Sequence, residues 1–230
     1  MPSLSEVLTT RPYPGRGIVA ARVGDGEWAI CYFLTGRSDA SQHRDLVPDD
    51  QGVLVVDTRL QSAHDELRHY RAVVRRERLL VVGNGDQAEP FADDIERGAD
   101  PWSAWKKHDY EPDAPIFTPR ILLALSTSTG ERVLHLAAVR KGTGIQGEQG
   151  RSLQSLTPAE SLKIRSGKLL STYRGTADDV IVSDGPVSVS TECKTPGDLE
   201  EEVWDALSAD VRVASITLTA EGIPIGAHHR

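Results

Sequence analysis

The sequence predicts an α+β domain of four layers, in which two antiparallel β-sheets pack face to face and helices cover both outer faces. Several apolar runs, such as 53–56 and 121–125, are hydrophobic at every position, whereas a strand with one face in water alternates with polar residues. Successive strands are joined by short turns, which favours hairpins over parallel βαβ units. Segments 90–97 and 196–207 carry an apolar stripe at helical spacing, as expected of helices that cover a sheet.

Glycine, proline and the apolar runs place the individual elements. The strands are predicted at 17–23, 27–34, 52–57, 70–74, 79–82, 121–126, 133–139, 168–173, 187–190 and 211–219. Helices are predicted at 61–67, 90–97, 101–107 and from Pro196, which Thr195 caps. The remaining segments are expected to be an N-terminal arm, loops at 35–44, 110–119 and 142–150, a turn at Gly130 and a tail at 228–229.

Length and charge limit the classes of function. With 230 residues and no linker, the chain is expected to form one domain over 1–230. It has 26 Lys and Arg against 34 Asp and Glu, a net charge of −8, which argues against a nucleic-acid partner. The sequence has no apolar run of about 20 residues and no basic-then-apolar leader, so neither a membrane partner nor secretion is expected. Cys31 and Cys193 lie far apart, and reduced thiols suit a cytoplasmic protein.

The candidate functional residues lie in four polar breaks between apolar runs. They are 11–17, 35–44, 84–87 and 110–120, each next to a predicted strand, and loops at strand ends often carry sites. Arg37 and Arg44, with Ser38 and Ser41 between them, offer donors suited to a phosphate, although each could also be a solvated cation. Glu111 is either a site carboxylate or the partner of a nearby cation.

Three other segments have their own alternatives. Residues 11–17 could be no more than an ordered proline-rich arm, and 84–86 either a turn or, before a helix, a place for an anion. Residues 68–78 hold five arginines and are expected to be mostly a charged edge strand. The histidines show no metal-binding spacing, so no metal site is predicted.

Taken in order, the four breaks resemble the archaeal-type inosine monophosphate (IMP) cyclohydrolase family and its bacterial relatives. The matching pieces are PYPGRG, YFLTGRS with Ser41 and Arg44, NGDQ, and YEPDAP followed by TPRI. A weaker match is STY at 171–173 with Gly175. The resemblance implies an Ntn-hydrolase-like αββα fold, which agrees with the four layers predicted from the strands.

The resemblance also implies the reaction and its residues. The family closes the purine ring of 5-formamidoimidazole-4-carboxamide ribonucleotide to IMP with loss of water, and needs no cofactor. Arg44 would polarise the formyl oxygen, Tyr70 would donate a proton, and Glu111 would take the amide proton. The predicted substrate-binding residues are Arg16, Arg37, Ser38, Asn84, Gly85, Asp86 and Arg120.

Some features depart from the family pattern. Relatives commonly carry an acidic residue and a threonine soon after NGDQ, where this chain has Ala88, Glu89 and Pro90. Two alternatives therefore stay open: a cyclase or hydrolase acting on a related imidazole or nucleoside-analogue ribonucleotide in specialised metabolism, and a non-catalytic nucleotide-binding module. The expected partner is a small nucleotide, and a homo-oligomer is as compatible with the sequence as a monomer.

Because the sequence shows no metal-ligand spacing, turnover of the nucleotide should survive exhaustive chelation. The measurement is the rate of purine formation before and after dialysis against EDTA, with no cofactor added. A rate that falls and returns with a divalent ion would reveal a site built from dispersed ligands.

Overall fold

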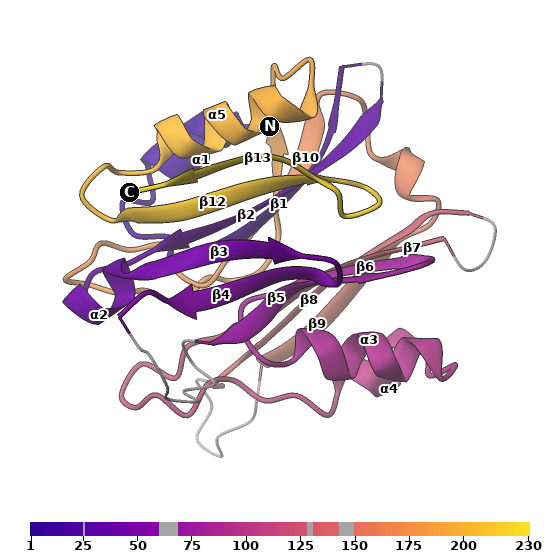
Figure 1. Ribbon diagram of the computed structural model, residues 1–230, viewed down its shortest axis with the longest axis horizontal. Helices are drawn as coiled ribbons and strands as arrows, with labels where there is room; N and C mark the ends of the chain where they lie inside the picture. The colour runs from indigo at the N-terminus through magenta and orange to yellow at the C-terminus, as the bar shows by residue number, and fades with distance from the viewer. Residues whose placement is uncertain (25, 60–68, 128–130, 143–149) are drawn as a thin grey trace.

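The computed structural model describes residues 1–24, 26–59, 69–127, 131–142 and 150–230, and they form two antiparallel β-sheets (Figure 1). The six-stranded sheet runs in the order β11 (Val187–Ser190), β10 (Ser166–Ser171), β1 (Arg16–Val23), β2 (Glu27–Thr35), β12 (Arg212–Thr219) and β13 (Pro224–His229). The seven-stranded sheet runs in chain order: β3 (Arg44–Asp49), β4 (Gly52–Asp57), β5 (Tyr70–Arg76), β6 (Leu79–Gly83), β7 (Arg120–Ser126), β8 (Val133–Arg140) and β9 (Gly150–Leu156).

Helices cover the outer face of each sheet. Figure 1 shows α1 (Leu4–Thr9) and α5 (Pro196–Ala206) over the six-stranded sheet, and α3 (Ala88–Glu96) and α4 (Pro101–Trp105) over the seven-stranded sheet. The short helices α2 (Asp39–Gln42) and η1 (Ala159–Ser161) lie in connections. The predicted sandwich of two antiparallel sheets is therefore confirmed.

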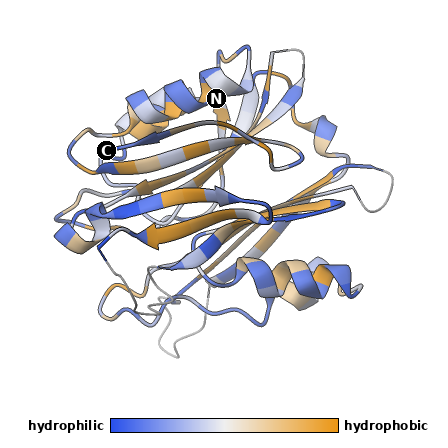
Figure 2. Ribbon diagram, viewed as in Figure 1, coloured by the Kyte–Doolittle hydropathy of each residue, from blue (hydrophilic) through white to orange (hydrophobic). Residues whose placement is uncertain are grey.

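Three apolar clusters hold the layers together. The largest lies between the two sheets and includes Tyr32, Val73 and Leu123. The second packs α1 and α5 on the six-stranded sheet, and the third packs α3 and α4 on the seven-stranded sheet. In Figure 2 hydrophobic residues follow the strands of both sheets, while the helices show both classes of residue. Since both faces of each sheet are covered, the inner strands need no polar face.

A buried carboxylate fastens α5 to the sheet beneath it. Glu200 is 2% exposed; its Oε1 accepts a hydrogen bond from the Ser215 hydroxyl, and its Oε2 accepts one from Thr217 Oγ1 at 2.5 Å. The Cys31 thiol lies 3.8 Å from Oε2, and His228 Nδ1 lies 3.3 Å from Oε1. One acidic side chain thus links the helix to β2, β12 and β13.

The ends of several strands meet at one end of the sandwich. The start of β1 lies beside the ends of β2 and β10, and the end of β6 lies beside the start of β7. Arg16 Nη1 donates a hydrogen bond of 2.8 Å to the carbonyl oxygen of Asn84, just after β6. The polar loops that follow or precede these strands are therefore gathered where the two sheets meet.

The strands predicted from apolar runs are all present, with bounds that differ by a few residues. The helices predicted near 90–97, 101–107 and after Thr195 are also present, and 110–119 contains no helix or strand. The predicted helix at 61–67, the turn at Gly130 and most of the loop at 142–150 fall outside the described residues.

Other expectations were wrong, and exposure explains most of them. The expected loop 35–44 contains the short helix α2, and β3 begins at its last residue; Gly150 begins β9, and the expected tail is part of β13. The strands β3, β9 and β13 are all sheet edges, and their exposed positions leave too few apolar residues for a pattern. The fourth sheet edge, β11, does alternate and was predicted. The expected N-terminal arm begins with α1, whose start is fixed by a capping box between Ser3 and Glu6.

The arginine-rich strand was also misplaced, because β5 is an inner strand between β4 and β6. Two of its three arginines form ion pairs with acidic side chains: Arg71 Nη1 lies 2.6 Å from Asp49 Oδ1 on β3, and Arg76 Nη2 lies 3.1 Å from Asp93 Oδ1 on α3. Among the described helices, none is long and apolar enough to cross a membrane.

Replacing Glu200 with Ala should lower the free energy of unfolding by about 2–3 kcal/mol, because the buried hydroxyls of Ser215 and Thr217 lose their acceptor. The measurement is a denaturant titration. The matched control is Asp205→Ala, an exposed position on the same helix, which should leave the midpoint unchanged. Equal midpoints for the two variants would contradict the anchoring role.

Candidate active site

A cavity of about 220 Å³ opens at the end of the sandwich where the strand ends meet. Its walls come from the start of β1, the β2–α2 connection, the start of β3, the loop before β7 and the segment after β10. The lining residues are Tyr13, Gly15, Arg16, Thr35, Arg37, Ser38, Ala40, Ser41, Arg44, Glu111, Asp113, Ile116, Thr118 and Tyr173. Of the predicted site residues, this cavity brings together Arg16, Arg37, Ser38, Arg44 and Glu111.

The centre of the site is a buried ion pair between the two sheets. Arg16 Nη2 lies 2.8 Å from Glu111 Oε2, and both residues are less than a tenth exposed. Burial by itself lowers the pKa of the Arg16 guanidinium, but the charge and hydrogen bond of Glu111, together with the contributions of Tyr70 and Tyr32, outweigh it and hold this pKa well above its usual value. The other oxygen, Glu111 Oε1, is buried and receives no hydrogen bond from any residue that the structure describes. Glu111 is one of the residues that line the cavity, and this oxygen is a strong acceptor without a donor among the described residues.

The loop that carries Glu111 is folded by its own polar groups. Three prolines, at 112, 115 and 119, keep the segment out of regular structure. The Glu111 amide donates to the Thr118 carbonyl at 2.9 Å, and the Thr118 amide donates to Asp113 Oδ1 at 2.6 Å. The loop therefore closes on itself and fixes the position of the glutamate.

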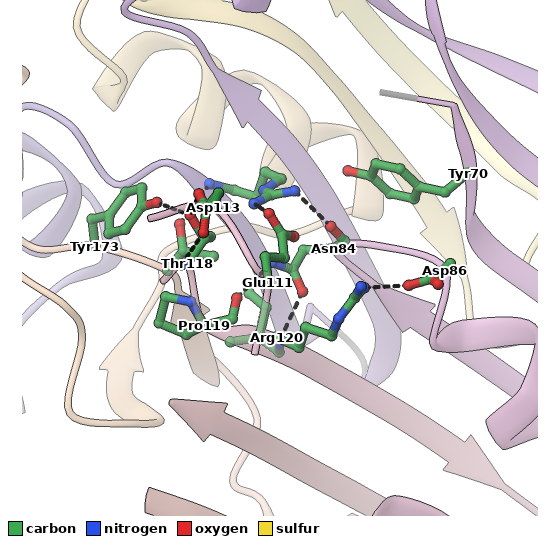
Figure 3. Close-up of polar contacts among 12 residues, drawn as sticks. Tyr70, Asn84, Asp86, Glu111, Asp113, Thr118, Pro119, Arg120 and Tyr173 are labelled. Atoms are coloured by element: carbon green, nitrogen blue, oxygen red, sulfur yellow. Dashed lines mark hydrogen bonds and ion pairs between the residues drawn. The ribbon is translucent and has the colours of Figure 1, made fainter. Parts of the chain in front are cut away.

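A second polar layer lies behind the ion pair (Figure 3). Asn84 is fully buried: Nδ2 donates to the Pro119 carbonyl at 2.8 Å, and Oδ1 accepts from the Ile121 amide at 2.8 Å and from Gln87. Arg120 Nη1 lies 2.7 Å from Gln87 Oε1 and 2.5 Å from Asp86 Oδ1.

This layer accounts for four of the predicted substrate-binding residues. A Cβ at Gly85 would stand 2.1 Å from Arg120 Nη1, so only glycine lets that arginine approach. Asn84, Gly85, Asp86 and Arg120 therefore support the loop and the ion pair, and they are not among the residues that line the cavity.

Backbone contacts hold two arginines along the cavity wall. Arg44 donates from Nε to the Ser41 carbonyl at 3.0 Å and from Nη2 to the Thr35 carbonyl at 3.1 Å. Arg37 Nη1 donates to the Ala177 carbonyl at 2.9 Å. Ser38 caps α2, and its hydroxyl accepts from the Ser41 amide at 3.2 Å. The wall is therefore a fixed cationic surface with hydroxyl groups, as an anion requires.

Tyr70, predicted to be catalytic, lies outside the cavity lining. Its hydroxyl is 2.8 Å from the hydroxyl of Tyr32, and the residue is 5% exposed. In Figure 3 this hydroxyl points toward Asn84 and Glu111. Its hydroxyl is thus directed toward the carboxylate of the ion pair, although Tyr70 is not among the residues that line the cavity.

The structure adds lining residues that the sequence did not single out. Tyr13 and Tyr173 stack with ring centroids 5.7 Å apart and planes 17° apart. The Thr118 hydroxyl hydrogen-bonds the hydroxyl of Tyr173 and Asp113 Oδ2. These residues lie within the matched motifs PYPGRG, YEPDAP with TPRI, and STY, but a motif alone does not say which of its members face a cavity.

The electrostatics follow from this arrangement. Burial raises the pKa of Tyr13, and the charges of Arg44, Arg37 and Arg16 act in the opposite direction. Three cations therefore act on one cavity in a chain whose net charge is −8. Among the described residues there is no group of three His, Cys, Asp or Glu side chains placed to hold a metal ion. The site can bind an anion and accept a proton.

The family model described as IMP cyclohydrolase-like protein matches residues 13–222, which is nearly the whole chain. The match includes the polar breaks 35–44, 84–87 and 110–120, residues 13–17 of the first break, and every residue that lines the cavity. Among curated proteins, no match to the chain was found.

Arg16→Met should lower the free energy of unfolding by about 3–5 kcal/mol, because it leaves the Glu111 carboxylate buried without its partner. The double variant Arg16→Met, Glu111→Gln should recover most of this loss, since both charges are then removed. Denaturant titrations of the single and double variants measure the coupling. If the losses in free energy of unfolding from Arg16→Met and Glu111→Gln simply add in the double variant, the two side chains do not stabilise each other.

Proposed function

The chain belongs to the IMP cyclohydrolase-like family, and from this premise we propose that it converts 5-formamidoimidazole-4-carboxamide ribonucleotide to IMP. The observation that carries the proposal is the buried Glu111, which has one oxygen without a hydrogen-bond donor and lines the same cavity as three arginines. A nucleotide needs cations for its phosphate, and ring closure needs an acceptor for the proton of a weak nucleophile.

The reaction is an internal condensation. The carboxamide nitrogen attacks the formyl carbon, so a C–N bond forms and the formyl oxygen becomes a hydroxyl. That hydroxyl then leaves as water. The water carries the formyl oxygen, one proton from the carboxamide nitrogen and one from the formamide nitrogen. The protein must therefore hold the two groups in reacting geometry, take a proton and return one.

The arginine wall is suited to the 5′-phosphate. Arg37 and the hydroxyl groups of Ser38 and Ser41 lie together at the β2–α2 connection. The guanidinium groups are already fixed by backbone carbonyls, so little side-chain freedom is lost when a phosphate binds. Arg44, which borders the same cavity, is available for the phosphate or for the formyl oxygen that becomes negatively charged during attack.

Glu111 has the geometry of a general base. One oxygen is fixed by Arg16 at 2.8 Å, which orients the carboxylate, and the other is free to accept a proton from the carboxamide nitrogen. Tyr70 is the proposed proton donor to the departing hydroxyl. Its hydrogen bond to Tyr32 supplies a second hydroxyl from which the proton can be replaced.

Glu111→Gln should lower the rate of ring closure by about 10²–10⁴-fold, because the amide keeps the size of the side chain but accepts no proton. The rate is followed by the purine absorbance during incubation with the formylated nucleotide. The control is Asp109→Asn, an exposed carboxylate two residues away that pairs with Arg151, and it should retain the wild-type rate. IMP binding should be nearly unchanged in both variants.

Three results would contradict the proposal in different ways. Equal rates for Glu111→Gln and Asp109→Asn would remove Glu111 from the chemistry. Nucleotide binding by the wild-type protein without any purine product would indicate a non-catalytic binding module. Conversion of another imidazole ribonucleotide, but not this one, would indicate the related activity in specialised metabolism.

A further inference from the structure

Three side chains that are linked by hydrogen bonds, the Tyr173–Thr118–Asp113 triad, lie along one wall of the cavity. Ring closure as described above does not use this triad. Thr118 Oγ1 donates to Asp113 Oδ2 at 2.5 Å, and the same oxygen is hydrogen-bonded to the Tyr173 hydroxyl. Asp113 Oδ1 accepts from the Thr118 amide at 2.6 Å. Figure 3 shows Tyr173, Thr118 and Asp113 in contact, beside Glu111.

The charge of Asp113 fixes which group donates and which accepts in each hydrogen bond of this triad. An ionised carboxylate only accepts hydrogen bonds, so the single hydroxyl hydrogen of Thr118 is used on Oδ2. Thr118 Oγ1 can then only accept from Tyr173. Burial raises the pKa of Tyr173 to about 12, so the phenol keeps its hydrogen at neutral pH and gives it to Thr118.

We propose that the Tyr173 hydroxyl oxygen is an obligate acceptor that binds an N–H group of the nucleotide base, and that Asp113 sets this polarity through Thr118. Tyr173 lines the cavity and has its only hydrogen turned toward Thr118. What it presents to a ligand is therefore lone pairs. Asp113 and Thr118 are positioning residues that act through the tyrosine.

The position of Tyr173 is as constrained as its polarity. Its ring stacks on Tyr13, and Gly15, at φ +74°, makes room for it, since a Cβ there would stand 2.5 Å from Tyr173 Cδ2. The Glu111 amide donates to the Thr118 carbonyl, so Thr118 and Asp113 belong to the same folded loop as the proposed base.

This inference rests on the proposed function for the identity of the N–H group. A primary carboxamide has two N–H bonds, and two acceptors on residues that line the cavity are candidates for them, Glu111 Oε1 and the Tyr173 oxygen. If one N–H is bound by each, the nitrogen that attacks the formyl carbon is held on both sides. In the product the same nitrogen is N1 of IMP, which carries a single N–H.

Two ligands and four variants test the inference. IMP presents an N–H at N1, whereas purine riboside 5′-monophosphate presents a bare nitrogen that only accepts. The dissociation constants of both are measured for the wild-type protein and for Tyr173→Phe, Thr118→Val, Thr118→Ser and Asp113→Asn. Thermal melts report whether each variant folds, and the rate of ring closure is measured for each.

The wild-type protein should prefer IMP. Tyr173→Phe should weaken IMP binding by about 3- to 10-fold, the loss of one hydrogen bond, and leave the other ligand unaffected. In Asp113→Asn the amide nitrogen donates to Thr118, Thr118 donates to Tyr173, and the phenol hydrogen turns toward the ligand. The preference for IMP should then fall by about tenfold or reverse. Thr118→Val should lose the preference, and Thr118→Ser should keep it.

The outcomes separate this inference from the proposed function. If the wild-type protein makes IMP but the ligand preference is the same in wild type, Tyr173→Phe and Asp113→Asn, the inference is overturned and the function stands. If the preference shifts as expected but the wild-type protein makes no IMP, the inference holds and the proposed function fails. A wild-type protein that binds neither ligand overturns both.

Discussion

The buried ion pair between Arg16 and Glu111 is the contact on which the candidate site depends. It joins the first strand of the six-stranded sheet to the loop before β7 of the seven-stranded sheet. Removing two charges from water is costly, and the cost is offset only where the geometry is good and further hydrogen bonds are made. Here Arg16 also donates to the Asn84 carbonyl, and the Glu111 amide donates to the Thr118 carbonyl. The pair thus fixes the positions of the two sheets and the loop relative to one another.

The same pair leaves one hydrogen-bonding position open. Arg16 engages Glu111 Oε2, while Oε1 is buried and receives no hydrogen bond from the described residues. A carboxylate whose only purpose was to hold the sheets together would be expected to use both oxygens, because an unsatisfied buried acceptor is unfavourable. Glu200 is the contrast within this protein: both of its oxygens are engaged, and it anchors a helix. The difference between the two glutamates separates a structural role from a proposed catalytic one.

Polar side chains around the site divide into those that support the site and those that line the cavity. Asn84 and Gln87 donate hydrogen bonds to backbone carbonyls around the start of β7, and Asp86 forms an ion pair with Arg120. Arg37, Ser38 and Arg44 border the open space instead. Loops that are equally polar in sequence thus differ in whether their side chains line the cavity or lie behind it. Support of this kind keeps a binding surface rigid, which limits the entropy lost when a ligand is bound.

The sequence by itself determined the fold class, the inner strands, the main helices and the loops in which the site lies. Inner strands and covering helices are specified by local hydrophobic patterns, such as those at 121–126 and 196–206, which persist whatever the rest of the chain does. The edge strands β3, β9 and β13 escaped prediction because their exposed positions leave them without such a pattern, whereas the edge strand β11 keeps an alternating one.

Tertiary structure alone decided which polar residues reach the cavity. Arg16 and Glu111 are 95 residues apart in sequence, and Thr118 and Tyr173 are 55 apart. Their contacts exist because the strand ends of two sheets meet at one end of the sandwich. Asn84 and Arg120 were read as ligand-binding from their motifs, yet their side chains are taken up by protein partners. Burial and hydrogen-bond direction depend on neighbours brought together by folding, and no local pattern encodes them.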